Sequence, residues 1–114
     1  MNGIKERQRA CQEVLLAALR NELAGRDVSA AFLIEDDGRP GVEVLDATER
    51  PRRVYVHLQF RWFYWGDRPD ERTSYVQLFH AVERIQQAAQ QGWRQGEQGE
   101  LSFSLNKIAN AYQF

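Results

Sequence analysis

Apolar residues recur with a helical period in two segments of the 114-residue chain. The first segment spans Ile4–Ala24 and is followed by Gly25, a residue suited to a helix C-terminus. The second segment spans Thr73–Gln91 and is followed by Gly92. Because this spacing gathers apolar side chains on one side of a helix, we predict two amphipathic helices, each with one face to bury. The apolar positions are Ile4, Cys11, Val14, Leu15, Ala18, Leu19 and Leu23 in the first, and Tyr75, Leu78, Phe79, Val82, Ile85 and Ala89 in the second.

Shorter segments alternate between apolar and polar positions, as strands do. Val28–Glu35 and Val42–Leu45 flank a turn rich in Asp and Gly at positions 36–41, which predicts an antiparallel hairpin. Glu100–Leu105 alternates in the same way and is followed by a short helical pattern that begins at Asn106. The pattern therefore places strands on both sides of the second long helix.

The longest alternating run, Arg53–Trp65, ends in aromatic residues and predicts one long strand. Side chains alternate across a strand, so the run divides into two faces. One face is almost entirely apolar and is predicted to be buried; it consists of Val54, Val56, Leu58, Phe60, Trp62 and Tyr64. The other, the predicted polar-aromatic face, consists of Tyr55, His57, Gln59, Arg61, Phe63 and Trp65. A shift of one residue exchanges the faces, so the sequence leaves open whether Trp62 or Trp65 is exposed.

These segments predict a single α+β domain covering residues 1–114, with the element order α-β-β-β-α-β-α. Short connections between strands favour an antiparallel sheet, and the two long helices are predicted to pack on one of its faces. The polar-aromatic face then lies on the opposite side of the sheet. This leaves it free for binding.

The predicted order is similar in part to those of double-stranded RNA-binding domains, secretion-chaperone-like folds, and small bacterial immunity proteins or phage-encoded inhibitors. The first resemblance implies a lysine cluster at the start of the last shared helix. This chain has Asp67, Asp70 and Glu71 there, with Arg68 and Arg72 as the basic residues. No residue motif specific to any of the three families is present.

Composition narrows the classes of partner. The formal net charge is -1, which argues against a general polyanion binder, because such proteins need an excess of Lys and Arg. Lys5 and Lys107 are the two lysines among 15 basic residues, an Arg bias typical of a high-GC bacterium or its phage. The single cysteine, Cys11, excludes an internal disulfide and is predicted to be a small buried residue. With no signal-peptide pattern and no long apolar segment, we expect a cytoplasmic protein without membrane contact.

The chain carries little that indicates catalysis. His57 and His80 are its only histidines, and no pair of Cys or His residues has metal-ligand spacing. The Gly-x-Ser-x-Gly, Walker and Gly-x-Gly-x-x-Gly motifs are all missing from the sequence. We therefore predict no metal, no cofactor and no catalytic residue.

The leading hypothesis is a non-enzymatic protein-binding module, such as an inhibitor, an immunity protein or a chaperone-like adaptor. The partner would be another protein or a second copy of the chain, bound through the polar-aromatic face, since Trp, Tyr and Arg dominate interface hot spots. One alternative is nucleic-acid binding through Arg and aromatic stacking. A second is a small enzyme that uses His57. A basic patch of Arg50, Arg52 and Arg53 could also hold an acidic group, and the sequence leaves its role open.

Overall fold

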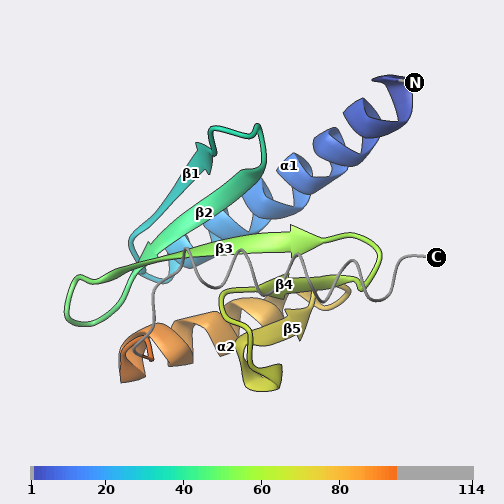
Figure 1. Cartoon of the computed structure of the whole chain (residues 1–114). Coiled ribbons are helices and arrows are strands. Elements are labelled where there is room, and N and C mark those ends of the chain that lie inside the picture. The colour runs from blue at the N-terminus through green and yellow to red at the C-terminus, as the bar shows by residue number, and fades with distance from the viewer. Residues whose placement is uncertain (1, 95–114) are drawn as a thin grey trace.

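A computed structural model of the chain describes residues 2–94 (Figure 1). Along the chain, one α-helix precedes and another follows a series of five strands, and the strand order in the sheet follows the chain order. All four neighbouring strand pairs are antiparallel, so the sheet is a simple meander. The elements, in chain order, are α1 (Asn2–Gly25), β1 (Ala30–Ile34), β2 (Pro40–Leu45), β3 (Pro51–His57), β4 (Trp62–Tyr64), the short 3-10 helix η1 (Pro69–Glu71), β5 (Arg72–Ser74) and α2 (Leu78–Gln91).

Both helices pack on the same face of the sheet, which we call the inner face. Leu16, Leu19 and Leu23 of α1 are fully buried, as is Ile85 of α2. They share one apolar cluster with alternate residues of the central strands. A hydrogen bond of 3.2 Å from Nη1 of Arg26, the residue after α1, to Gln86 Oε1 links the end of α1 to α2. The strand residues of that cluster are Val42, Val44, Val54, Val56 and Phe63, with Trp65 just beyond β4.

The predicted α+β class, with an antiparallel sheet and both long helices on one face, is confirmed. The predicted order is wrong in one respect, because five strands rather than three separate the helices. The hairpin of β1 and β2 is present as predicted. The predicted strand Glu100–Leu105 and the helix from Asn106 lie outside the described residues.

Several residues of the predicted apolar stripe in the first helix are exposed. Cys11 is exposed, and so is Val14, at 69 %, although both were predicted to be buried. Val14 lies two residues before the buried Leu16, about 200° around the helix, and therefore faces away from the core. Figure 1 shows that the N-terminal end of α1 projects past the end of the sheet. The left-handed backbone after α1 is taken by Asp27, with φ of 62°, rather than by Gly25.

The second helix starts later than its pattern indicated. Arg72, Thr73 and Ser74 form β5 against β4, so α2 begins at Leu78 rather than at Thr73. Val82, Ile85 and Ala89 are buried as the stripe predicted, whereas Phe79 is 64 % exposed.

The prediction of one strand over Arg53–Trp65 is wrong. The chain reverses after His57 and returns as β4, with Tyr55 opposite Tyr64, Val56 opposite Phe63, and His57 opposite Trp62. A turn with an even number of residues exchanges the parity of everything after it. Phe63 and Trp65 therefore join the buried face, with exposures of 0 % and 2 %, and Trp62 and Tyr64 move to the outer face of the sheet.

Candidate functional site

The turn between β3 and β4 contains no Gly, Pro, Asn or Asp and is held by contacts made elsewhere in the chain. Arg61 takes a left-handed backbone with φ of 59°. Its carbonyl accepts a 3.0 Å hydrogen bond from the N–H of Tyr75, whose hydroxyl donates to the Leu58 carbonyl at 3.3 Å. The Phe60 N–H donates to His57 Nδ1 at 3.2 Å, and the two rings stack with centroids 4.3 Å apart. The turn is thus fixed by Tyr75, which directly follows β5, and by the His57 imidazole.

The six residues of the predicted polar-aromatic face do not lie together. Phe63 and Trp65 belong to the core. Gln59 and Arg61 are exposed in the turn. Tyr55 and His57 remain on the outer face of the sheet, where Tyr64 and Trp62 are their neighbours. His57 is half-buried. Burial lowers the pKa of its imidazole below the ordinary value of 6.5, and this effect outweighs the smaller rise caused by a hydrogen bond with its own backbone.

Tyr55 belongs to a closed polar network on the outer face. Its hydroxyl donates to Glu35 Oε1 at 2.6 Å, and Arg53 Nη1 donates to both Glu35 oxygens at 2.9 Å. Burial, helped by the bond to Glu35, raises the pKa of Tyr55 to about 12. The Arg39 guanidinium lies 4.1 Å from the Tyr55 ring centroid, and the ring packs over Gly41, where a Cβ would come within 3.0 Å of it.

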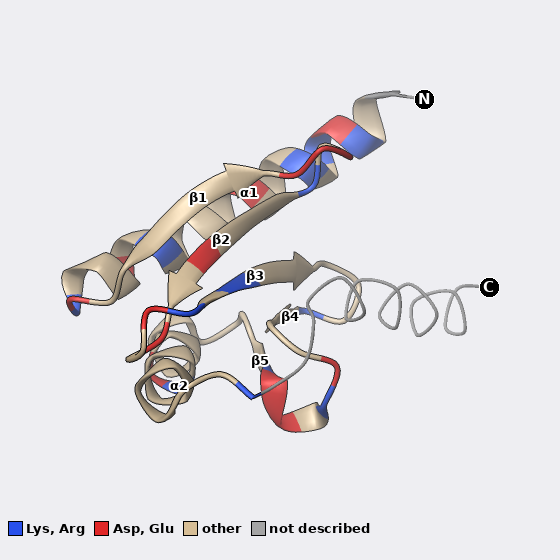
Figure 2. Ribbon diagram, turned by 60° about the vertical axis from the view of Figure 1, so that its left-hand side comes forward, with Lys and Arg blue, Asp and Glu red and all other residues tan. Residues whose placement is uncertain are grey.

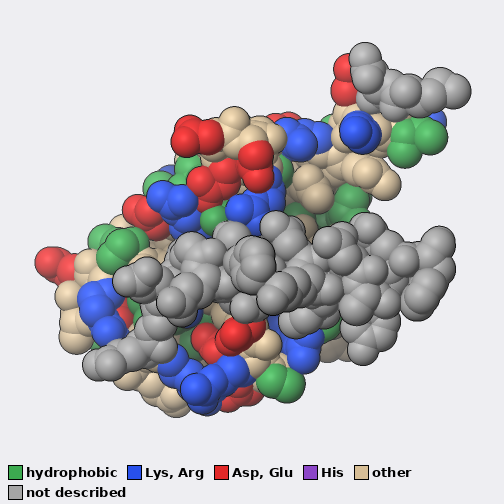
Figure 3. Space-filling view, viewed as in Figure 1, with side chains coloured by type: hydrophobic (Ala, Val, Ile, Leu, Met, Phe, Trp, Pro, Cys, Tyr) green, Lys and Arg blue, Asp and Glu red, His purple; other side chains and the backbone are tan. Residues whose placement is uncertain are grey.

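The charged side chains of this network are paired with one another, so we assign the network a structural role. Arg53 lies opposite Glu43 in the register of β2 and β3, with Arg53 Nε 3.6 Å from Glu43 Oε2. Figure 2 shows the acidic band of β2 beside the basic band of β3. Acidic and basic side chains also alternate around the β1–β2 hairpin in Figure 3. A surface with neutralised charges offers little attraction to a charged ligand.

The arginines of the predicted basic patch are also engaged in ion pairs and hydrogen bonds within the fold. Arg52 is buried and lies 3.6 Å from Glu71 Oε2, while Arg50 donates to Asp46 Oδ2 at 3.1 Å. Asp46 in turn accepts the N–H of Trp93 at 3.0 Å. Burial alone would raise the pKa of Asp46, but the amides of Trp93 and Arg50 and the contacts with Thr48 hold it well below its ordinary value. These bonds fasten the end of α2 to the β2–β3 loop.

A different part of the molecule has the composition of a binding site. A cleft of about 430 Å³ opens where the β3–β4 turn, β4, β5 and the start of α2 meet. We call it the basic-aromatic cleft, because every charged residue that lines it is basic and two aromatic rings form part of its wall. Its lining residues are Phe60, Arg61, Trp62, Arg72, Thr73, Ser74, Val76, His80 and Arg84.

The positive charge of the basic-aromatic cleft is not neutralised within the described part of the chain. There, none of Arg61, Arg72 and Arg84 lies within 4.0 Å of a carboxylate oxygen. Arg84 Nη2 donates to the Asp70 carbonyl at 3.0 Å, which fixes its position without cancelling its charge. The exposed His80 also lines the cleft. An anionic group entering the cleft would meet several donors at once.

The aromatic wall of the cleft is already packed. The Arg72 guanidinium carbon lies 4.1 Å from the Trp62 ring centroid, a cation-π contact. Phe60 meets Trp62 edge to face, with centroids 4.9 Å apart, and its own ring stacks on His57. Each ring therefore has a neighbour, and a stacked ligand ring would have to displace one. Beside them, Val76 is 68 % exposed.

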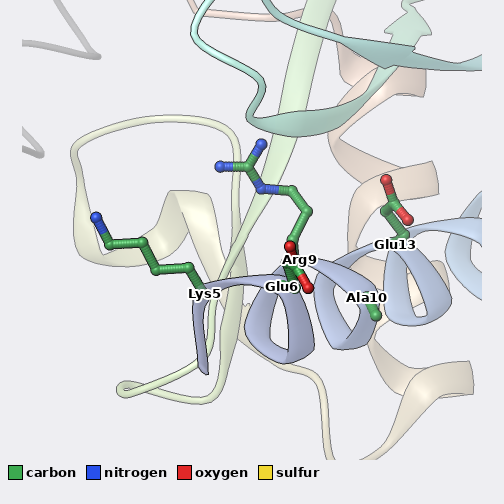
Figure 4. Close-up of a pocket in the computed structure, with 5 residues that line it drawn as sticks. All are labelled: Lys5, Glu6, Arg9, Ala10 and Glu13. Carbon is green, nitrogen blue, oxygen red and sulfur yellow. The ribbon is translucent and has the colours of Figure 1, made fainter. Parts of the chain in front are cut away.

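A second hollow runs along α1 and is lined by Lys5, Glu6, Arg9, Ala10 and Glu13 (Figure 4). All five come from one helix, and the two basic and two acidic residues offset each other. Among residues 2–94, no group of three or more His, Cys, Asp or Glu side chains is arranged to hold a metal ion. Within the same range, no helix combines the length and the apolar character needed to cross a lipid bilayer.

Comparison with protein-family models, with curated protein sequences and with solved structures found no match for this chain. The fold and the candidate site are therefore defined by the residues and contacts described above. They form a small α+β domain with a basic-aromatic cleft at one end of its sheet.

Sequence reasoning found only Arg61 among the residues of the cleft. It assigned Phe60 and Trp62 to the buried side of one long strand and took Thr73 for the start of a helix. Arg72, Thr73 and Ser74 are all polar, so the short strand β5 left no apolar alternation in the sequence. Arg84 had no local signal, because only the packing of α2 against β5 brings it to the cleft.

Proposed function

We propose that this protein is a non-enzymatic protein-binding module that takes an acidic, partly apolar segment of a partner protein into the basic-aromatic cleft. The observation that carries the proposal is the grouping of Arg61, Arg72 and Arg84 in one cleft with no carboxylate partner among the described residues. Arg and Trp are the side chains most often found at the energetic centre of protein interfaces. The proposed site lies at the end of the hairpin that carries the predicted polar-aromatic face, and Arg61 belongs to both.

Three features support a protein partner over a nucleic acid. The rings of Phe60 and Trp62 already pack against His57, Arg72 and each other, which leaves no free platform of the kind that stacks successive bases. Exposed apolar Val76 lines the cleft, and a protein segment can cover it whereas a phosphate cannot. The net charge of -1 supplies no wider field to attract a polyanion.

The enzymatic alternative receives no support from the surroundings of His57. Its Nδ1 accepts the Phe60 N–H, and its ring stacks on that of Phe60. Within the described residues it forms no ion pair with a carboxylate that could orient it as a general base.

Site-specific photocrosslinking in host lysate tests the proposal. Val76 in the cleft and Val14 on α1 are equally exposed, at 68 % and 69 %, and either can be replaced by benzoylphenylalanine. We expect irradiation to give a protein adduct from position 76 that withstands nuclease treatment, and none from position 14. The charge-reversal pair Arg72→Glu with Arg84→Glu should abolish the adduct.

The matched control for charge reversal is Arg7→Glu, at an exposed position on α1, which should leave the adduct intact. Circular dichroism checks that each variant is folded. A nuclease-sensitive adduct would replace the proposal by nucleic-acid binding. Equal adducts from positions 76 and 14, or an adduct that survives both charge reversals, would contradict a site in the cleft.

A further inference from the structure

The strand β1 forms an open edge of the sheet. The Leu45 N–H donates to the Ser29 carbonyl at 3.1 Å, and the Glu35 N–H donates to the Arg39 carbonyl at 2.8 Å, so odd-numbered residues bond to the β2 side. Main-chain groups alternate in an antiparallel pair, and those of Ala30, Phe32 and Ile34 therefore point away from the sheet. The Ala30 carbonyl accepts a 3.2 Å bond from Arg20 Nε, and no other strand of the described chain lies beyond this edge.

The edge lacks the features that usually keep such a strand from pairing. Its sequence, Ala-Ala-Phe-Leu-Ile, has no charged residue and no proline. Phe32 is 41 % exposed and Ile34 is 51 % exposed, although their opposite residues on β2, Val42 and Pro40, are buried. An apolar edge whose outward main-chain groups at Phe32 and Ile34 bond to no other strand of the described chain is a site for adding another strand.

We propose that a second copy of this chain pairs with β1 in antiparallel fashion, about a two-fold axis at Phe32. In that register, the small Ala30 lies opposite the large Ile34 of the other copy, and Ala31 lies opposite Leu33. Phe32 is the one residue that lies opposite the same residue of the other copy, and cross-strand aromatic pairs are favourable. Such self-complementarity is what a two-fold interface requires. The main-chain groups of Phe32 and its neighbours then gain partners.

Charges on α1 match the same arrangement. Arg20 lies at the Ala30 end of β1 and Arg9 bonds to the Gly38 carbonyl at the other end, so α1 runs antiparallel to β1. Glu13 precedes Arg20 by seven residues and therefore projects from nearly the same side of the helix. Figure 4 shows Arg9 and Glu13 rising from α1 toward the β1–β2 hairpin. The two-fold axis brings Glu13 of one copy toward Arg20 of the other, once on each side.

This inference does not depend on the function proposed above. The basic-aromatic cleft is built from β4, β5 and α2, at the edge of the sheet opposite to β1. Pairing through β1 would give one continuous sheet with a cleft at each end. Both clefts would remain open to partners.

Sedimentation velocity over a concentration series tests the pairing, together with amide hydrogen exchange of the full chain. We expect a concentration-dependent dimer in which the amides of Phe32 and Ile34 become protected. Phe32→Lys should raise the dissociation constant at least about tenfold, because it places two lysines opposite each other in an apolar edge. Phe79→Lys is the matched control, since it makes the same change at a 64 % exposed phenylalanine on α2 and should leave the dimer intact.

A charge exchange provides a second test that leaves β1 unchanged. Glu13→Arg should weaken the dimer, and adding Arg20→Glu to it should recover most of the affinity, because the pair is restored with its signs reversed. A chain that stays monomeric up to about 1 mM would overturn the inference. So would amides of Phe32 and Ile34 that exchange equally at all concentrations, or a dimer lost in Phe79→Lys as readily as in Phe32→Lys.

Discussion

Replacement of Phe63 by alanine should lower the free energy of unfolding by about 3–5 kcal/mol. Phe63 has no exposed surface and packs edge to face on Tyr75, with ring centroids 6.2 Å apart. An aromatic side chain buries about 200 Å², which at about 25 cal/mol per Å² corresponds to about 5 kcal/mol. Alanine retains part of that burial, while the cavity that it leaves adds a cost. The loss is a large share of the roughly 5–15 kcal/mol that stabilises a typical domain.

Urea denaturation, followed by circular dichroism, measures the effect directly. The midpoint should fall while the dependence of the free energy on urea concentration is unchanged, since the same surface is exposed on unfolding. Phe79→Ala is the control: it removes the same atoms from a side chain that is 64 % exposed, and should change stability by no more than about 0.5 kcal/mol.

The result that would refute the reasoning is a small effect at Phe63. If Phe63→Ala costs less than about 1 kcal/mol, the side chain is not in the core, and β4 does not return in the register that places it opposite Val56. The single long strand predicted from the sequence would then regain support.

Three further predictions concern the turn, pH and the end of α2. Arg61→Gly should leave the free energy of unfolding unchanged or raise it by up to about 1 kcal/mol, because glycine takes a φ of 59° without steric cost. Burial lowers the pKa of His57 in the folded chain, so as the pH falls the unfolded chain binds a proton at this position before the folded chain does. The free energy of unfolding should therefore fall as the pH drops below about 6.5, and it should fall less steeply in His57→Asn. Urea midpoints measured at several pH values test this. Asp46→Asn should lower Tm by at least about 5 °C in calorimetry, since the carboxylate accepts the amides of Arg50 and Trp93, whereas exposed Asp36→Asn should not.

The sequence was sufficient for the features that depend on local periodicity. The helical spacing of Leu19 and Leu23 and of Val82 and Ile85 indicated which sides of the helices would be buried, because such spacing leaves one helix face apolar. The Asp and Gly residues at positions 36–41 marked the first hairpin, since those residues favour turn conformations. Together these patterns predicted the α+β class and the layer of helices on one face of the sheet.

Tertiary structure decided the second hairpin and, with it, the candidate site. The residues from Leu58 to Arg61 have no turn preference of their own, and Tyr75, distant in sequence, supplies the bonds that hold the reversal. That reversal turned Phe63 inward and Trp62 outward. Alternation along a chain fixes which side chains share a face only while the strand continues. Contacts between distant segments determine where a strand ends, so the sequence predicted a binding face and the fold determined which residues compose it.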